Sequence, residues 1–178
     1  MTKNKLIIPE HEKVYHYTTG ESHKYLGYYY NLSVNRSSNT PGIYIQGGNM
    51  IMECPDPKDI EEKEYIMDMW YKERASEIFV PIVAEAAAKA APYTNGQVPD
   101  LRIYKMLDRW GSCNPKSKIL IMNLELIKVP TICTEYIALH ECLHYRYPSH
   151  DFAFMAALGN TMPNWKKREN LLNDYYPI

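Results

Sequence analysis

The chain has 178 residues and a net charge of −1, with 46% hydrophobic and 23% charged residues, a composition typical of a soluble globular protein. The balanced charge predicts no strong attraction to nucleic acid or to an anionic membrane. No apolar run approaches the roughly 18 residues that span a bilayer, and the first residues lack the apolar core of a signal peptide. We therefore expect a single cytoplasmic domain, residues 1–178, with neither a nucleic-acid nor a membrane partner.

The cysteines do not predict a structural zinc ribbon, because Cys54, Cys113, Cys133 and Cys142 contain no C-x-x-C pair. In a cytosolic chain we expect them to be reduced. Cys113 and Cys142 lie in motif segments, where a thiolate is a candidate soft metal ligand. Cys142 stands two positions after His140, on another face of the helix, and we expect it to pack in the core.

Residues 1–23 show weak periodicity and contain His11, His16 and His23. The spacings between these histidines match no ligand template. We therefore expect irregular surface here, and a second metal site is the less favoured alternative.

Three β segments follow. Residues 24–34 are rich in tyrosine and predict a strand, since aromatic side chains favour pleated surfaces. Residues 35–41 are rich in turn-forming residues and predict a loop. Residues 42–46 and 49–54 predict a hairpin around Gly47-Gly48.

A long helix is predicted over residues 59–91, with an apolar stripe at helical spacing. Acidic residues in its first turns suit the helix dipole. Pro81 is expected to kink or split the helix, because proline removes a hydrogen bond and clashes with the preceding turn. Residues 92–99 are expected to connect this helix to the next segment.

Two further strands are predicted at residues 101–107 and 118–123. We expect them to pair as a hairpin, with residues 114–117 as the turn. Residues 109–113 lie between them. For this segment, contact with the functional site and a purely structural role, with Trp110 in the core, are equally supported by the sequence.

The sequence His140-Glu141-Cys142-Leu143-His144 has the pattern H-E-x-x-H within an apolar helix predicted around residues 134–146. A four-residue spacing places both imidazoles on one helical face, where they can bind the same metal ion. Glu141 stands beside the first ligand and can reach a metal-activated water without binding the metal itself. It is therefore the candidate general base.

A catalytic metal site needs a third protein ligand and an open position for water. His150 is the candidate, since Pro148 should end the first helix and the chain can then turn back. Asp151 is the alternative, because carboxylate oxygen is the other common third ligand. We expect Ser149 to cap a helix over residues 151–158 that stops at Gly159.

The end of the chain is predicted as a loop over residues 160–165 and a last helix over residues 165–176. Three consecutive basic residues, 166–168, lie in this helix. Three charges are too few to indicate a nucleic-acid patch, and we expect them on a solvated face.

Several of these segments together resemble a known family. His140-Glu141-x-x-His144, His150, Phe154, Pro163 and Trp165 are similar to the ending of the YgjP-like metal-dependent hydrolases, a zincin group related to the SprT/Spartan metallopeptidases. Further matches lie upstream, in order Tyr25-Leu26-Gly27, Arg109-Trp110-Gly111-Ser112-Cys113, Asn123-Leu124 and Pro130. The resemblance runs from about residue 24 to the C-terminus. It implies a zincin-like fold and places residues 109–113 near the metal.

We therefore predict an α+β fold, with a small antiparallel sheet packed against helices that carry the H-E-x-x-H motif. Residues 1–57 form its β-rich part and residues 58–178 its helical, metal-binding part. The expected ligands of Zn²⁺ are His140, His144 and His150, and Glu141 is the expected base.

The predicted function is zinc-dependent hydrolysis of peptides or unfolded proteins. Two alternatives stay open: hydrolysis of a small molecule with a non-peptide bond, such as a nucleotide phosphoanhydride, and a non-enzymatic binding module. The oxyanion helper is not identified, with Arg109, Tyr145 and Tyr147 as candidates.

Overall fold

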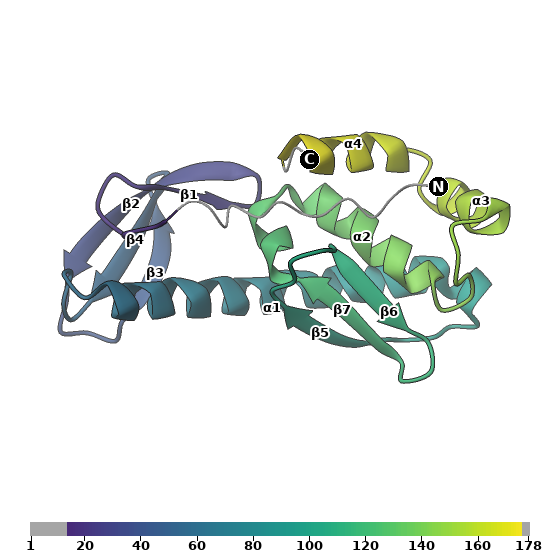
Figure 1. Cartoon of the computed structure of the whole chain (residues 1–178), viewed down its shortest axis with the longest axis horizontal. Coiled ribbons are helices and arrows are strands. Elements are labelled where there is room, and N and C mark those ends of the chain that lie inside the picture. The colour runs from purple at the N-terminus through teal and green to yellow at the C-terminus, as the bar shows by residue number, and fades with distance from the viewer. Residues whose placement is uncertain (1–13, 176–178) are drawn as a thin grey trace.

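The structure is a computed structural model that describes residues 14–175. It has the predicted α+β composition, with two small sheets arranged along one long helix (Figure 1). In chain order the elements are β1 (Ser22–Tyr25), β2 (Tyr28–Arg36), β3 (Gly42–Gln46), β4 (Asn49–Cys54), α1 (Ile60–Thr94), β5 (Asp100–Tyr104), β6 (Gly111–Asn114), β7 (Ile119–Asn123), the 3-10 helix η2 (Leu124–Lys128), α2 (Thr131–Leu143), α3 (Phe152–Thr161) and α4 (Trp165–Tyr175).

Helix α1 runs along the length of the molecule (Figure 1). Its 35 residues correspond to about 52 Å at 1.5 Å per residue. Asp59 caps its first turn by accepting a hydrogen bond from the Glu62 N–H at 3.0 Å. Pro81 does not split the helix, because α1 continues through Pro81 to Thr94. Buried side chains on both sides of the proline hold this segment helical, and their packing offsets the roughly 3 kcal/mol that an internal proline costs.

The first sheet has the strand order β1-β2-β4-β3 and lies against the first half of α1 (Figure 1). The predicted hairpin is present, since β3 pairs with β4 in antiparallel orientation. The pair β2–β4 is parallel, so the sheet is mixed rather than purely antiparallel as predicted.

The predicted single strand over residues 24–34 is in fact two strands. The chain turns at Leu26 and Gly27, both with positive φ. The N–H groups of these two residues donate to backbone carbonyls of η2. A Cβ on Gly27 would lie 2.7 Å from Cγ of Pro130, so the close approach requires glycine. This turn fastens the first sheet to the start of α2.

The second sheet has the order β5-β7-β6 and also contains one parallel pair. The predicted hairpin between residues 101–107 and 118–123 is wrong, because β5 and β7 pair in parallel. The antiparallel partner of β7 is β6. Asn114 closes the turn between them, since its side-chain oxygen accepts hydrogen bonds from the N–H groups of Lys116 and Ser117. Because this turn is short, β6 rather than β5 forms the hairpin with β7.

Helix α2 lies between α1 and α4. It begins three residues before the predicted range and ends at Leu143, so His144 is its C-cap. Two contacts from α4 hold it: the Tyr136 hydroxyl donates to Glu169 at 3.2 Å, and Arg168 forms an ion pair with Glu135. Arg168 thus has a structural role in the packing of α4 on α2. It does not belong to the solvated basic face that was expected for residues 166–168.

Of the N-terminal histidines, His23 departs from the expected irregular surface, whereas His16 agrees with it. His23 is buried in β1, beside Glu21 and with its ring stacked on Tyr15 at 4.6 Å, whereas irregular surface was predicted. His16 is exposed, and His11 lies outside the described residues. Neither His16 nor His23 joins a metal-binding cluster in the described part of the chain.

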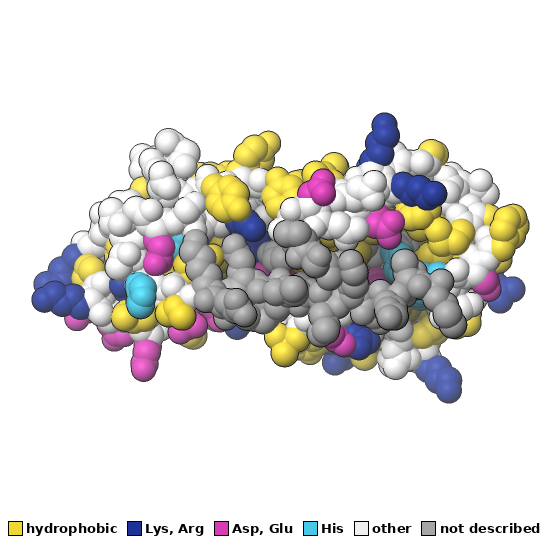
Figure 2. Space-filling view, turned by 45° about the horizontal axis from the view of Figure 1, so that its top comes forward, with side chains coloured by type: hydrophobic (Ala, Val, Ile, Leu, Met, Phe, Trp, Pro, Cys, Tyr) yellow, Lys and Arg dark blue, Asp and Glu magenta, His cyan; other side chains and the backbone are white. Residues whose placement is uncertain are grey.

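On the face in Figure 2, side chains of both charge signs are scattered rather than gathered. Within residues 14–175, no helix is both long and apolar enough to cross a membrane.

Candidate metal site

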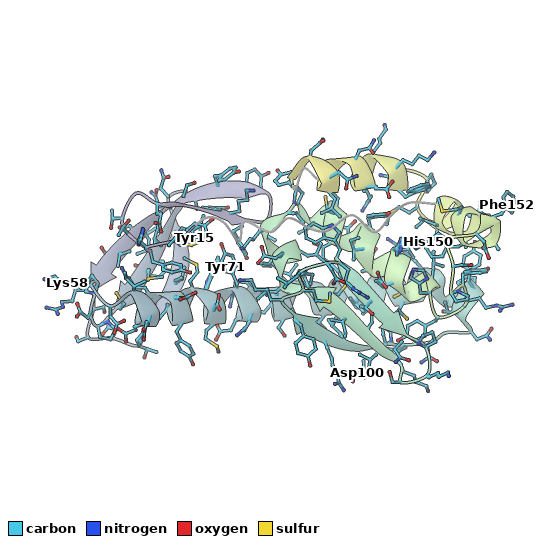
Figure 3. All side chains as sticks on the ribbon, viewed as in Figure 1. Tyr15, Lys58, Tyr71, Asp100, His150 and Phe152 are labelled. Atoms are coloured by element: carbon cyan, nitrogen blue, oxygen red, sulfur yellow. The ribbon has the colours of Figure 1, made fainter. Side chains whose placement is uncertain are left out.

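The structure brings together the three histidines that were predicted as metal ligands. Their Nε2 atoms are separated by 3.2 Å between His140 and His144, by 2.8 Å between His140 and His150, and by 3.1 Å between His144 and His150. His140 lies in the last turn of α2, His144 caps that helix, and His150 precedes α3. Figure 3 shows His150 beside the C-terminal end of α2.

A backbone hydrogen bond fixes which nitrogen of His144 faces this cluster. Its Nδ1 lies 2.7 Å from the carbonyl oxygen of Tyr147. A carbonyl can only accept, so Nδ1 carries the proton and Nε2 presents a lone pair to the other histidines. Such a bond from the outer ring nitrogen commonly orients a metal-binding imidazole. This role of Tyr147 could not be predicted from the sequence, because a backbone carbonyl is present in every residue type.

The donor set fits a divalent metal ion. Burial, with smaller contributions from His144 and His150, lowers the pKa of His140 to about 3, and burial also lowers the pKa of His144. Neutral imidazoles that aim lone pairs at one another are stabilised by a cation between them, and imidazole nitrogen suits zinc, copper, iron and nickel. In a tetrahedral zinc site the nitrogens would be about 3.3 Å apart, slightly wider than the separations here.

One aromatic ring lies against all three histidines. The Phe154 ring centroid is 4.9 Å from those of His140 and His144 and 4.8 Å from that of His150. Phe154 is fully buried, so it forms an apolar wall on one side of the cluster. In the sequence, Phe154 stands out only through the family resemblance and through its position four residues after His150.

His150 is exposed, and its position depends on the start of α3. The predicted cap Ser149 is wrong, because Asp151 caps the helix by accepting a hydrogen bond from the Phe154 N–H at 3.0 Å. Ser149 instead donates to the second carboxylate oxygen of Asp151 at 3.2 Å. The carboxylate considered as an alternative ligand is thus engaged in capping. Gly159 does not stop α3, which continues to Thr161.

Glu141 lies on α2 against strand β6. A Cβ placed on Gly111 would be 2.6 Å from Cγ of Glu141 and 2.9 Å from its Oε1. Burial raises the pKa of Glu141 to about 8, and the nearby charge of Arg109 opposes that shift. The segment 109–113 therefore touches the residue predicted as the base, while Trp110 also packs against the core.

The loop that precedes Gly111 is held by one buried asparagine at the end of β7. The amide nitrogen of Asn123 donates to the carbonyls of Met106 and Arg109 at 2.9 and 2.8 Å. Its side-chain oxygen accepts from the N–H groups of Met106 and Glu125. All four hydrogen-bonding positions of the amide are thus used, and they fix the backbone that leads into β6.

An ion pair and two buried thiols limit which side chains near the histidines can bind a metal ion or a substrate. Arg109 forms a bidentate pair with Asp108, at 2.6 and 3.0 Å. Burial raises the pKa values of Cys113 and Cys142 to about 12 each, so both are protonated thiols near neutral pH. Cys142 is packed in the core, as predicted.

Residues 2–175 match a family model described as the YgjP-like metallopeptidase domain. No curated protein matches the chain in sequence.

Proposed function

The chain belongs to the YgjP-like metallopeptidase family, and we propose that it is a zinc-dependent peptidase that hydrolyses peptides or unfolded proteins. The observation that carries the proposal is the meeting of three histidine Nε2 atoms, none more than 3.2 Å from the next, beside a buried carboxylate that does not belong to the cluster.

In this proposal His140, His144 and His150 hold the metal ion through Nε2. A divalent ion in such a site supplies Lewis acidity, which activates water for hydrolysis near neutral pH. With its carboxyl ionised, which a cation held by the neighbouring histidines would favour, Glu141 accepts the proton of the attacking water and returns it to the leaving amine. Gly111 keeps the Glu141 carboxylate in place, and the Tyr147 carbonyl keeps His144 in the tautomer that can bind metal.

The position of strand β6 favours a peptide as the substrate. It is an outer strand of its sheet, and its first residue, Gly111, touches Glu141. The free edge of a strand can hold an extended peptide through main-chain hydrogen bonds. We therefore propose that the substrate backbone lies along β6, which would bring a peptide bond close to the histidine cluster.

No specific observation favours either alternative function. Hydrolysis of a nucleotide phosphoanhydride would need free cationic groups to bind the phosphates. Arg109 is the cation whose charge acts on Glu141, and it is already paired with Asp108. A purely structural metal site would be closed by a fourth protein ligand. Only three residues form the cluster within the described part of the chain, which favours an open catalytic position.

The decisive experiment compares unfolded casein, a peptide mixture and nucleoside triphosphates as substrates of the purified protein. We expect casein and peptides to be cleaved, the activity to be lost with a chelator, and zinc to restore it. Glu141→Gln should lower the rate by a factor of roughly 10² or more while zinc stays bound, because it removes a proton acceptor and no metal ligand. Cleavage of nucleotides alone, or loss of zinc from Glu141→Gln, would contradict the proposal.

A further inference from the structure

The histidines of the cluster are not all held in the same way. His144 is oriented by the hydrogen bond that its Nδ1 donates to the Tyr147 carbonyl oxygen at 2.7 Å. The Nδ1 of His140 is buried and has no hydrogen-bond partner among the residues that the structure describes. Because a metal-binding imidazole is usually oriented by such a bond, the orientation of His140 must depend on the side chains packed against it.

Helix geometry tends to draw His140 out of the cluster. The side chain of a helical residue leans toward the N-terminal end of the helix, over the residues three and four positions before it. The imidazole of His140 therefore leans toward Tyr136, one turn earlier on α2, and away from His144, one turn later. An obstacle on the side of Tyr136 would keep the His140 Nε2 atom close to those of the other two histidines.

The ring of Tyr136 lies where such an obstacle is needed. Its centroid is 5.9 Å from that of the His140 imidazole, with an interplanar angle of 72°, and this edge-to-face arrangement is favourable for aromatic pairs. Phe154 contacts all three histidines. Tyr136, by contrast, makes a ring contact with only one of them within the described structure. Its influence is therefore specific to His140.

Tyr136 is itself held by helix α4, which lies along α2 (Figure 1). The Tyr136 ring stacks on Trp165, with centroids 6.4 Å apart and an interplanar angle of 16°. Its hydroxyl donates to Glu169 at 3.2 Å. Burial raises the pKa of this hydroxyl well above its usual value, so it stays protonated and can donate. The ring is only 4% exposed and has little freedom to move aside for the imidazole.

We propose that Tyr136 is a positioning residue for His140, and that α4 belongs to the metal site because Trp165 and Glu169 hold Tyr136 in place. The ring blocks the movement of His140 away from the other two ligands, so the three nitrogens converge before a metal ion binds, and this preorganisation raises the affinity. The inference rests on the metal binding in the proposed function and does not depend on which bond the protein hydrolyses.

The test compares two buried tyrosines in the full chain. Tyr136→Leu removes the ring beside His140. Tyr71→Leu is the matched control, because Tyr71 is 6% exposed, its hydroxyl donates to a backbone carbonyl at 2.6 Å, and it lies far from His150 (Figure 3). Both variants lose a ring and a hydrogen bond, so both should melt at a lower temperature without metal. Only Tyr136→Leu should bind zinc more weakly, by about fivefold or more in competition with a chromophoric chelator.

Bound Co²⁺ reports on the geometry of the site, because its visible absorption depends on the arrangement of its ligands. The spectrum of Tyr136→Leu should differ from that of the parent, and the spectrum of Tyr71→Leu should match it. Tyr136→Phe keeps the ring and should retain the parent's spectrum and, within about twofold, its zinc affinity. Trp165→Leu removes the stacking partner of Tyr136 and should weaken zinc binding by about threefold or more.

Three results would overturn the inference. One is the parent's zinc affinity and cobalt spectrum in Tyr136→Leu, or in Trp165→Leu should Tyr136→Leu fail to fold. Another is an equal loss of affinity in Tyr136→Leu and Tyr71→Leu, which would show that zinc binding follows overall stability. The third is a parent protein that binds no zinc, which would overturn the metal site as well. Absence of peptide cleavage in a parent that binds zinc would contradict only the proposed function.

Discussion

The backbone of Gly111 lies directly against the side chain of Glu141, so closely that an added Cβ would be 2.6 Å from Cγ of the glutamate. The φ angle of Gly111 does not lie in the left-handed region, so the glycine is needed for space rather than for backbone conformation. Strand β6 and helix α2 can therefore approach only with this residue at the contact, and the position of the proposed base depends on it.

Gly111→Ala should displace the Glu141 carboxylate while it leaves the histidines in place. We expect hydrolysis to fall by roughly tenfold or more, because a shift of about 1 Å at a catalytic group has a large effect on rate, and zinc affinity to change little. Gly159→Ala is the control, since a Cβ there meets only the Trp165 ring nitrogen at 3.9 Å. Full activity of Gly111→Ala would show that the contact does not position the base.

The wall formed by Phe154 should set metal affinity. Phe154→Leu removes the ring that contacts all three histidines and should weaken zinc binding by roughly tenfold, a loss typical for residues that orient metal ligands. Phe79→Leu is the matched control, because Phe79 is equally buried, in α1. Both variants lose packing and should unfold more easily. Competition with a chromophoric chelator measures the affinity, and equal zinc affinities in the two variants would contradict a positioning role.

His150→Ala should leave a two-histidine site with much weaker zinc binding. The melting temperature of the zinc-loaded protein should fall, because metal bound to the native state adds its binding free energy to folding. The chelated forms should melt at similar temperatures, since the His150 side chain is exposed. His16→Ala removes another exposed histidine and is the control. If His150→Ala retained the parent's zinc affinity, the third ligand would lie elsewhere.

The pH dependence of stability in the chelated protein should report on His140 and Glu141. The pKa of His140 falls from 6.5 to about 3 on folding, so its contribution to stability is lost as pH falls below 6.5. The pKa of Glu141 rises from 4.5 to about 8, so its contribution is present below 4.5 and is lost as pH rises toward 8. Of these two groups the glutamate gives the larger slope between pH 6.5 and 8, so stability should decrease over that range.

Thermal unfolding of the chelated protein at several pH values checks this sign. The melting temperature should fall from pH 6.5 to 8 in the parent and change much less in Glu141→Gln, which cannot lose the proton. A parallel fall in both proteins would mean that Glu141 ionises in the folded state as easily as in the unfolded one.

Local patterns in the sequence were enough to predict the histidine cluster, one hairpin and one turn. The spacing of His140 and His144 predicted a shared helical face, Gly47-Gly48 predicted the β3–β4 hairpin, and Pro148 predicted a turn that brings His150 back. Each prediction depends on residues within about ten positions of one another, where helix period, turn chemistry and proline geometry are decisive.

The tertiary structure decided what depends on distant partners. The parallel pairing of β5 with β7, the uninterrupted passage of α1 through Pro81, and the contact between Gly111 and Glu141 have no local signature. Strand direction depends on which edge is available, and a helix continues through proline when buried neighbours on both sides compensate the lost hydrogen bond. The sequence selected the side chains that we propose to react. The surfaces that hold them in place came from packing between segments far apart in the chain, because packing energy depends on their arrangement in space.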